Sequence, residues 1–115
     1  MARALTTNRA IDAFITRVIS EANHHAPEVA AIIMPLSQAV RARLTLGPDT
    51  VEVYERSGNL ARTCWVTING NRYVFKYNYE TKKIELKAHS LQGVTIRDFD
   101  NATSPAAIAR QAAAL

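Results

Sequence analysis

Residues 60–79 read LARTCWVTINGNRYVFKYNY, and this stretch decides the fold. On both sides of Asn69-Gly70, apolar and polar side chains alternate with the period of two that is typical of β-strands. Asn and Gly tolerate the positive φ angles of a two-residue type I′ turn, so the dipeptide predicts a tight hairpin. The pairs that this turn places opposite each other on one face are Val66 with Tyr73, Cys64 with Phe75, and Arg62 with Tyr77.

A second predicted turn, at Thr81-Lys82, extends the same face to the next strand. The turn also places Lys76 opposite Lys87 on the other face, which is unfavourable unless Glu85 or an anion relieves the repulsion. Two separate turns thus collect apolar side chains on one side of the sheet, and this agreement supports the register. The pairs predicted here are Ile84 with Tyr79, Leu86 with Tyr77, and Ala88 with Phe75.

The same alternation continues through most of the chain beyond Thr50 and predicts an antiparallel meander. Turn residues separate the strands, at Ser57-Gly58, Asn69-Gly70 and Glu80-Thr81-Lys82. We predict four strands, at 51–56, 60–68, 72–79 and 83–89, and a short fifth strand at 94–97.

In the first third of the chain the period changes to that of a helix. Between Thr7 and His24, apolar residues recur at steps of three and four, which predicts a helix capped by Thr7 or Asn8. We expect a second helix from Pro27, because proline suits the first helical position. A kink or break is expected near Pro35, since proline lacks an N–H and clashes with the preceding turn.

The last part of the chain contains Thr103-Ser104-Pro105, which is typical of a helix cap and first turn, followed by an alanine-rich stretch. The predicted fold is therefore α+β, with two N-terminal helices, a four- to five-stranded antiparallel meander sheet, and a C-terminal helix packed on one sheet face. We expect a single domain over 1–115, with a helical part at 1–47, the sheet at 50–99 and the last helix at 104–115.

Composition narrows the class of protein. The apolar share of 48% is that of a chain able to bury a core, so a disordered segment is excluded. The single cysteine, Cys64, cannot form an intramolecular disulfide, which favours a reducing compartment and a cytoplasmic location. The longest apolar run, 29–36, is far shorter than the ~20 residues of a membrane span, so we expect no membrane partner.

The face opposite the predicted core carries the candidate binding residues. A tryptophan in a polar surround is typical of the anchor of a protein interface. The leading hypothesis is therefore a non-enzymatic binding or interaction module that self-associates as a homodimer or binds an unidentified protein. The six candidates on this face are Trp65, Tyr54, Arg72, Lys76, Lys87 and His89.

Nucleic-acid binding is the alternative for the same face. The net charge of +4 and the four cations Arg72, Lys76, Lys83 and Lys87 suit phosphate groups, and Trp65 offers a stacking surface. A solvated sheet face is favoured over nucleic-acid binding as the explanation of these residues, because the other aromatic side chains of the sheet belong to the predicted core.

Elsewhere in the chain, the residue types that can act in catalysis or bind a metal form no recognised constellation. We therefore predict no catalytic residue, metal or cofactor. The side chains of His24-His25 diverge on a helix, and Cys64 and His89 fall on opposite faces of the sheet. Asp98 and Asp100 form the densest polar cluster. They indicate a turn and cap, and they leave open an enzyme with an acid–base or cation site.

Three segments of the C-terminal half carry a resemblance to a known group. They are Tyr73-Val74-Phe75-Lys76-Tyr77-Asn78, Lys83-Ile84-Glu85-Leu86, and Phe99-Asp100-Asn101 with Thr103. These segments are similar to small proteins encoded in bacterial integron gene cassettes. The resemblance implies a bacterial cytoplasmic protein and assigns no site residue.

Overall fold

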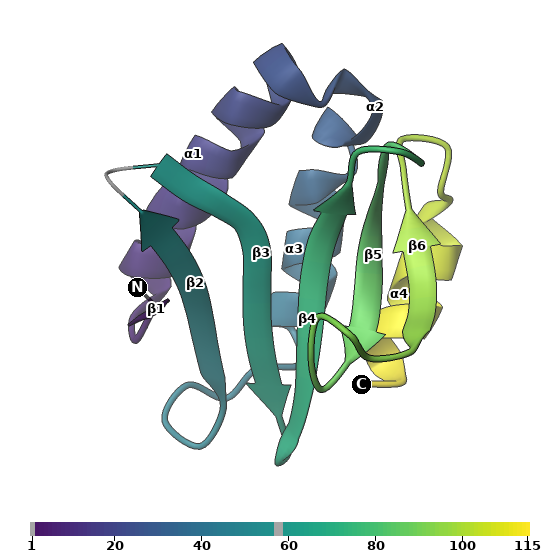
Figure 1. Cartoon of the computed structure of the whole chain (residues 1–115). Coiled ribbons are helices and arrows are strands. Elements are labelled where there is room, and N and C mark those ends of the chain that lie inside the picture. The colour runs from purple at the N-terminus through teal and green to yellow at the C-terminus, as the bar shows by residue number, and fades with distance from the viewer. Residues whose placement is uncertain (1, 57–58) are drawn as a thin grey trace.

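The computed structural model describes the backbone of residues 2–56 and 59–115, and the side chains of 3–54 and 63–115. The predicted turn at Ser57-Gly58 and the predicted pair of Arg62 with Tyr77 lie outside these residues. Six antiparallel strands form one sheet in chain order, as a meander (Figure 1). The strands are β1 (Ala2–Ala4), β2 (Thr50–Arg56), β3 (Asn59–Ile68), β4 (Asn71–Asn78), β5 (Lys83–Ala88) and β6 (Thr95–Phe99).

The hairpin that decides the fold has the predicted register. Cys64 lies opposite Phe75 and Val66 opposite Tyr73. Asn69 and Gly70 both have positive φ angles, of 55° and 82°, as a type I′ turn requires.

The pairing of β4 with β5 differs from the prediction by two residues. Tyr77 lies opposite Ile84, because the connection is a four-residue loop, 79–82, and not a two-residue turn. The side-chain oxygen of Asn78 accepts hydrogen bonds from two backbone N–H groups of this loop, at 2.9 and 3.3 Å, which favours the wider loop. A shift of two residues keeps each side chain on its predicted face. Tyr79 now belongs to the loop and is 54% exposed.

This shift also removes the predicted repulsion between two lysines, and that prediction was wrong. Lys76 lies opposite Glu85, and Lys87 lies opposite Val74. The Nζ atom of Lys87 is 3.8 Å from a carboxylate oxygen of Glu85, and both side chains are only 16% exposed. Glu85 therefore offsets the positive charge of Lys87, and its cross-strand position opposite Lys76 is favourable as well.

Strand β1 was not predicted, because Ala2–Ala4 has none of the β-branched or aromatic residues that indicate a strand. It forms because β2 offers it a row of backbone partners, from Tyr54 to Glu52. The backbone N–H of Leu5 donates to the carbonyl of Val51 at 2.8 Å, and the Leu5 side chain is buried. The sheet therefore has one strand more than the sequence predicted.

The helices are α1 (Asn8–His25), α2 (Pro27–Ala30), α3 (Ile33–Arg41) and α4 (Pro105–Ala113). Both predicted caps are confirmed. The Thr7 hydroxyl accepts a hydrogen bond from the Ala10 N–H at 3.1 Å, and the Ser104 hydroxyl accepts one from the Ala107 N–H at 3.2 Å.

The second predicted helix is broken, as expected, but the break precedes the proline by one turn. The turn lies at Ala31 and Ile32, between α2 and α3. A proline ring clashes with the carbonyl four residues before it, and for Pro35 that carbonyl belongs to Ala31. Pro35 then occupies the first turn of α3, where a missing N–H leaves no hydrogen bond unmade.

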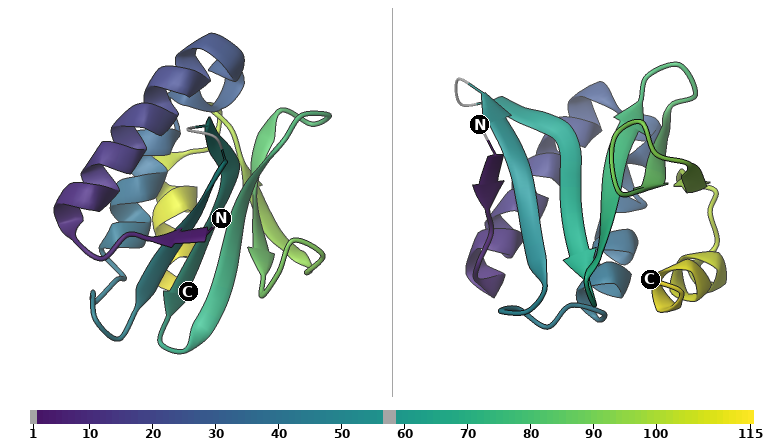
Figure 2. Two further views of the ribbon diagram at one scale, coloured as in Figure 1. Left: turned by 60° about the vertical axis from the view of Figure 1, so that its left-hand side comes forward. Right: turned by 60° about the horizontal axis from the view of Figure 1, so that its bottom comes forward.

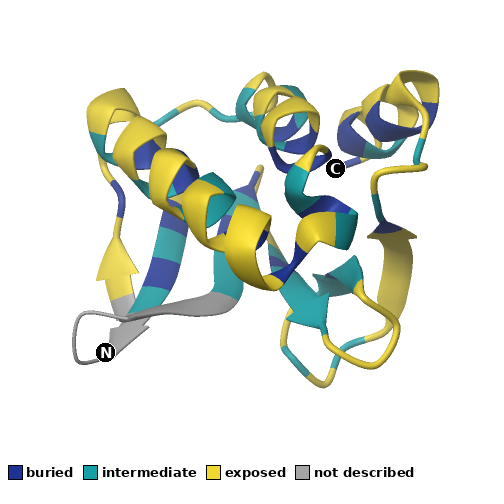
Figure 3. Ribbon diagram, turned by 90° about the horizontal axis from the view of Figure 1, so that it is seen from above, coloured by how far each residue is buried: buried dark blue, intermediate teal, exposed yellow. Residues whose placement is uncertain are grey.

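Helices α1, α3 and α4 cover one face of the sheet, as predicted, and leave the other face open (Figure 2). The buried residues of the helices lie on the sides that face the sheet (Figure 3). Phe99, Ile68 and Leu86 are the largest fully buried side chains, and all three point from the sheet toward the helices.

The buried carboxylate of Asp49 is hydrogen-bonded to two connecting segments, the one between α3 and β2 and the turn between β3 and β4. Asp49, which the sequence indicated only as part of the end of the helical region, is 8% exposed. Its two carboxylate oxygens accept hydrogen bonds from the backbone N–H groups of Thr45 at 2.8 Å and Asn69 at 3.0 Å. These two bonds, with a smaller contribution from Arg43, hold the pKa of Asp49 below its ordinary value of 3.8.

We predict that Asp49→Asn lowers the urea midpoint of unfolding at neutral pH, because the amide offers one acceptor oxygen where the carboxylate offers two. The lowered pKa means that the ionised form stabilises the fold above pH 3.8 and that this stabilisation is lost as the pH falls below that value. The difference between the wild-type and Asp49→Asn midpoints should therefore shrink below about pH 4. An unchanged difference down to about pH 2 would contradict this role.

Candidate ligand-binding cavity

The open face of the sheet, called here the outer face, carries a small cluster around Val74. Trp65 lies opposite Val74, and Val74 lies opposite Lys87, so the three residues form a row across β3, β4 and β5. The Arg72 guanidinium stands over the Trp65 ring, 5.7 Å from its centroid. Val74 lies on the face opposite the helices and is nevertheless fully buried, because its long neighbours cover it.

The other candidates of the outer face lie farther from this row. Lys76 belongs to the next row, opposite Glu85. Tyr54 lies beside β1, opposite Ala2. His89 follows β5 with a φ of 66°, and its N–H donates to the carbonyl of Arg72 at 2.9 Å. The structure therefore brings Trp65, Arg72 and Lys87 close together around Val74. Homodimer formation and nucleic-acid binding on this face stay predictions.

The acidic cluster near the end of β6 makes structural contacts. The carboxylate of Asp98 lies 4.0 Å from the Lys83 ammonium. Asp100 accepts a hydrogen bond from the Ala102 N–H at 2.9 Å, and its own N–H donates to the Thr103 hydroxyl at 3.0 Å. These bonds agree with the favoured interpretation of a turn before α4.

Asn101, from the same turn, has a role that the sequence did not indicate. Its side-chain oxygen accepts from the Ala31 N–H at 3.0 Å, and its amide donates to the Pro27 carbonyl at 2.8 Å. The turn before α4 is thereby attached to both ends of α2. Within the described residues, no three His, Cys, Asp or Glu side chains gather in a group that could hold a metal ion.

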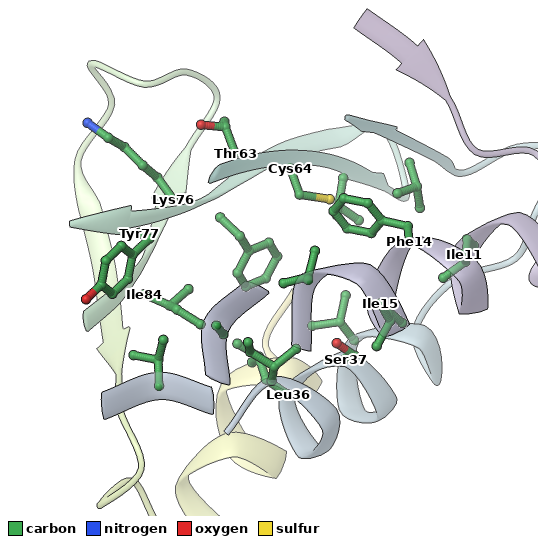
Figure 4. Close-up of a pocket in the computed structure, with 18 of the residues that line it drawn as sticks. Ile11, Phe14, Ile15, Leu36, Ser37, Thr63, Cys64, Lys76, Tyr77 and Ile84 are labelled. Atoms are coloured by element: carbon green, nitrogen blue, oxygen red, sulfur yellow. The ribbon is translucent and has the colours of Figure 1, made fainter. Parts of the chain in front are cut away.

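A cavity that could hold a ligand lies on the other side of the sheet. A half-enclosed cavity of about 200 Å³ separates α1 from β3 and β4 (Figure 4). Its helical wall includes Phe14 and Val18 from α1, and its sheet wall includes Cys64 and Phe75. Figure 4 shows Phe14 and Cys64 pointing into the space from opposite walls.

The side chains around the cavity are apolar but incompletely packed. Phe14, Val18, Cys64 and Phe75 are all half-buried, although each lies on the core side of its element. Their neighbours in the sheet are well packed, since Val53 lies opposite Cys64 and Leu86 lies opposite Phe75, and both are almost fully buried, as is Phe99 on β6. The open space is therefore local to these four side chains, and buried residues of α1 and the sheet, such as Ile15 and Val66, flank it.

A few polar residues from the helices and the strands also line the cavity. Glu21 and His25 are the exposed members of the lining set, so they mark where the cavity meets solvent. Arg41 also lines the cavity, and its guanidinium is bound to Asp12 and to the side-chain oxygen of Asn8, the latter at 3.2 Å. Thr63 and Lys76 line it through their backbone, because their side chains point to the other side of the sheet (Figure 4).

Cys64 supplies the thiol on the cavity wall. Burial raises the pKa of this thiol to about 12 from an ordinary value of 9.0. The thiol is therefore protonated at neutral pH and acts as a small apolar group.

Sequence reasoning missed the residues at the mouth of the cavity. Glu21 was not singled out as a candidate, and His25 was considered only together with His24, whose side chain diverges from it on the helix. The one available signal was their spacing of four, which puts two polar side chains on the same side of α1 beside the apolar stripe.

A comparison with families of known proteins covers residues 11–110 of the chain. The matching family is described as integron cassette protein VCH_CASS1 chain. The chain belongs to this family. The match confirms the resemblance noted for the C-terminal half and extends it over the helices. No curated protein matches the chain.

The description of this family states no substrate, reaction or partner, so a function has to be inferred from the cavity. In the part of the chain that the structure describes, no helix is long and apolar enough to cross a membrane.

Proposed function

We propose that this integron cassette protein binds a small apolar molecule in the cavity between α1 and the sheet. The observation that carries the proposal is the half-buried apolar lining on both walls, which faces an open space of about 200 Å³. Apolar cavities of about 150 Å³ stay dry and take up molecules the size of benzene, so the space suits one or two fused rings.

The energetics favour such an occupant. Each Å² of apolar surface removed from water contributes about 25 cal/mol, and a ligand here would cover Phe14 and Val18 on one side and Phe75 on the other. Both walls belong to one chain, so they enclose a molecule of side-chain size rather than a flat protein partner. The prediction of a non-enzymatic binding module is kept, and the proposed site moves from the outer face to this cavity.

Titration calorimetry with naphthylmethanol tests the proposal. A probe of about a dozen non-hydrogen atoms, each contributing roughly 0.4–0.5 kcal/mol, should bind with a Kd on the order of 100 µM. Val18→Trp, which fills the same space, should weaken this binding. Glucose, a polar molecule of similar size, is the control and should not bind.

Two outcomes would count against the proposal. One is the lack of saturable binding up to millimolar naphthylmethanol. The other is undiminished binding to a folded Val18→Trp protein, since the probe would then occupy a different surface.

A further inference from the structure

We infer that the ligand of this cavity carries a positively charged amine beside its apolar part, and that Glu21 recognises the amine. This inference rests on the proposed function and adds the chemical class of the ligand. It starts from the polar groups that line the cavity and from what each of them already binds.

Only some of these polar groups are available to a ligand. The Arg41 guanidinium is engaged by Asp12 and Asn8, and the Lys76 side chain leaves from the opposite face of the sheet (Figure 4). The Cys64 thiol is protonated and behaves as an apolar group. At the solvent-facing mouth, the charge that meets a ligand comes from Glu21.

Glu21 and His25 stand one turn apart on α1, so both side chains lie along the same rim. A carboxylate accepts hydrogen bonds only, and a neutral imidazole accepts at one of its nitrogens. An ammonium group has three donors and a positive charge, so it suits both residues. A carboxylate on the ligand would meet the like charge of Glu21.

The geometry also places the apolar part of such a molecule. Val18 lines the cavity one turn before Ala22, and Ala22 follows Glu21 directly on α1. A ring that fills the space between Val18 and Phe75 can therefore carry a short aminomethyl arm toward the rim. The whole chain has a net charge of +4, which disfavours a cation, so a preference for an amine has to come from the local carboxylate.

The test compares naphthylmethylamine with naphthylmethanol, which share the ring and differ in the head group. At low salt and about pH 7.5 the amine is protonated, and it should bind wild-type protein roughly three- to fivefold more tightly than the alcohol. In Glu21→Gln this preference should fall to about one, because the amine loses the carboxylate that favours it over the alcohol. Naphthylacetate, which carries a negative charge, should be the weakest of the three probes.

Glu80→Gln is the matched control, because it removes the same charge from the loop between β4 and β5, away from the cavity lining. It should retain the preference for the amine. Equal binding of amine and alcohol to wild-type protein would overturn the inference and leave the proposed function intact. An equal loss of preference in Glu80→Gln would also overturn it, since the effect would then follow from net charge. If neither probe binds, the proposed function itself fails.

Discussion

Val18→Trp is expected to reduce the affinity for naphthylmethanol by more than tenfold while the protein remains folded. Val18 is half-buried on the helical wall, and an indole at this position would occupy much of a space of about 200 Å³. Because the indole enters an existing space rather than a filled core, we expect a change in the free energy of unfolding of less than about 1 kcal/mol. Calorimetry and urea unfolding measure the two quantities.

The control for this substitution is Ala13→Trp, which adds the same side chain to an exposed position of α1 and should leave binding unchanged. If Val18→Trp fails to fold, Ala22→Leu fills the cavity with a smaller group and serves as the second variant. Full affinity in a folded Val18→Trp protein would show that the probe binds elsewhere.

Phe99→Ala should cost about 3–5 kcal/mol in the free energy of unfolding, the largest stability change we predict for a single substitution. Phe99 is 1% exposed, lies opposite Ile84 on the core side of β6, and belongs to the core cluster that includes Ile108 of α4. The loss combines the transfer of a buried ring to water with the cavity left behind. It is a large share of the 5–15 kcal/mol by which domains are usually stable.

Phe75→Ala provides a matched comparison, because the same group is removed from a half-buried ring that already faces open space. We expect about half the loss of Phe99→Ala, since less apolar surface is withdrawn from water. Equal losses for the two variants, measured by urea unfolding, would show that the space beside Phe75 is as well packed as the surroundings of Phe99.

Local signals in the sequence account for most of the fold. The Asn69-Gly70 turn, the helix caps and the two periods depend on residues close together in the chain, and the structure confirms them. One prediction fails locally, at the loop between β4 and β5, and others fail where a contact is made with a distant segment. Strand β1 forms only against β2, and Asn101 reaches α2 across more than 70 positions.

The alternation of side chains determined by itself which residues face the helices. A strand points successive side chains to opposite faces, so even the two-residue error between β4 and β5 preserved this division. The alternation does not state how far apart the two layers lie. Residues such as Cys64 and Phe75 were therefore interpreted as core, and the structure shows that they line a cavity.

That distance is decided by tertiary structure alone. Around Phe99 and Ile108 the layers meet with almost complete burial, whereas beside α1 the same pattern of residues leaves a space of about 200 Å³. Helix α1 is placed by its connection to α2, by the Arg41 contacts with Asp12 and Asn8, and by the sheet edge that β1 extends. Periodicity records the direction of a side chain, and packing between segments distant in sequence decides whether that side chain meets another residue or an open cavity.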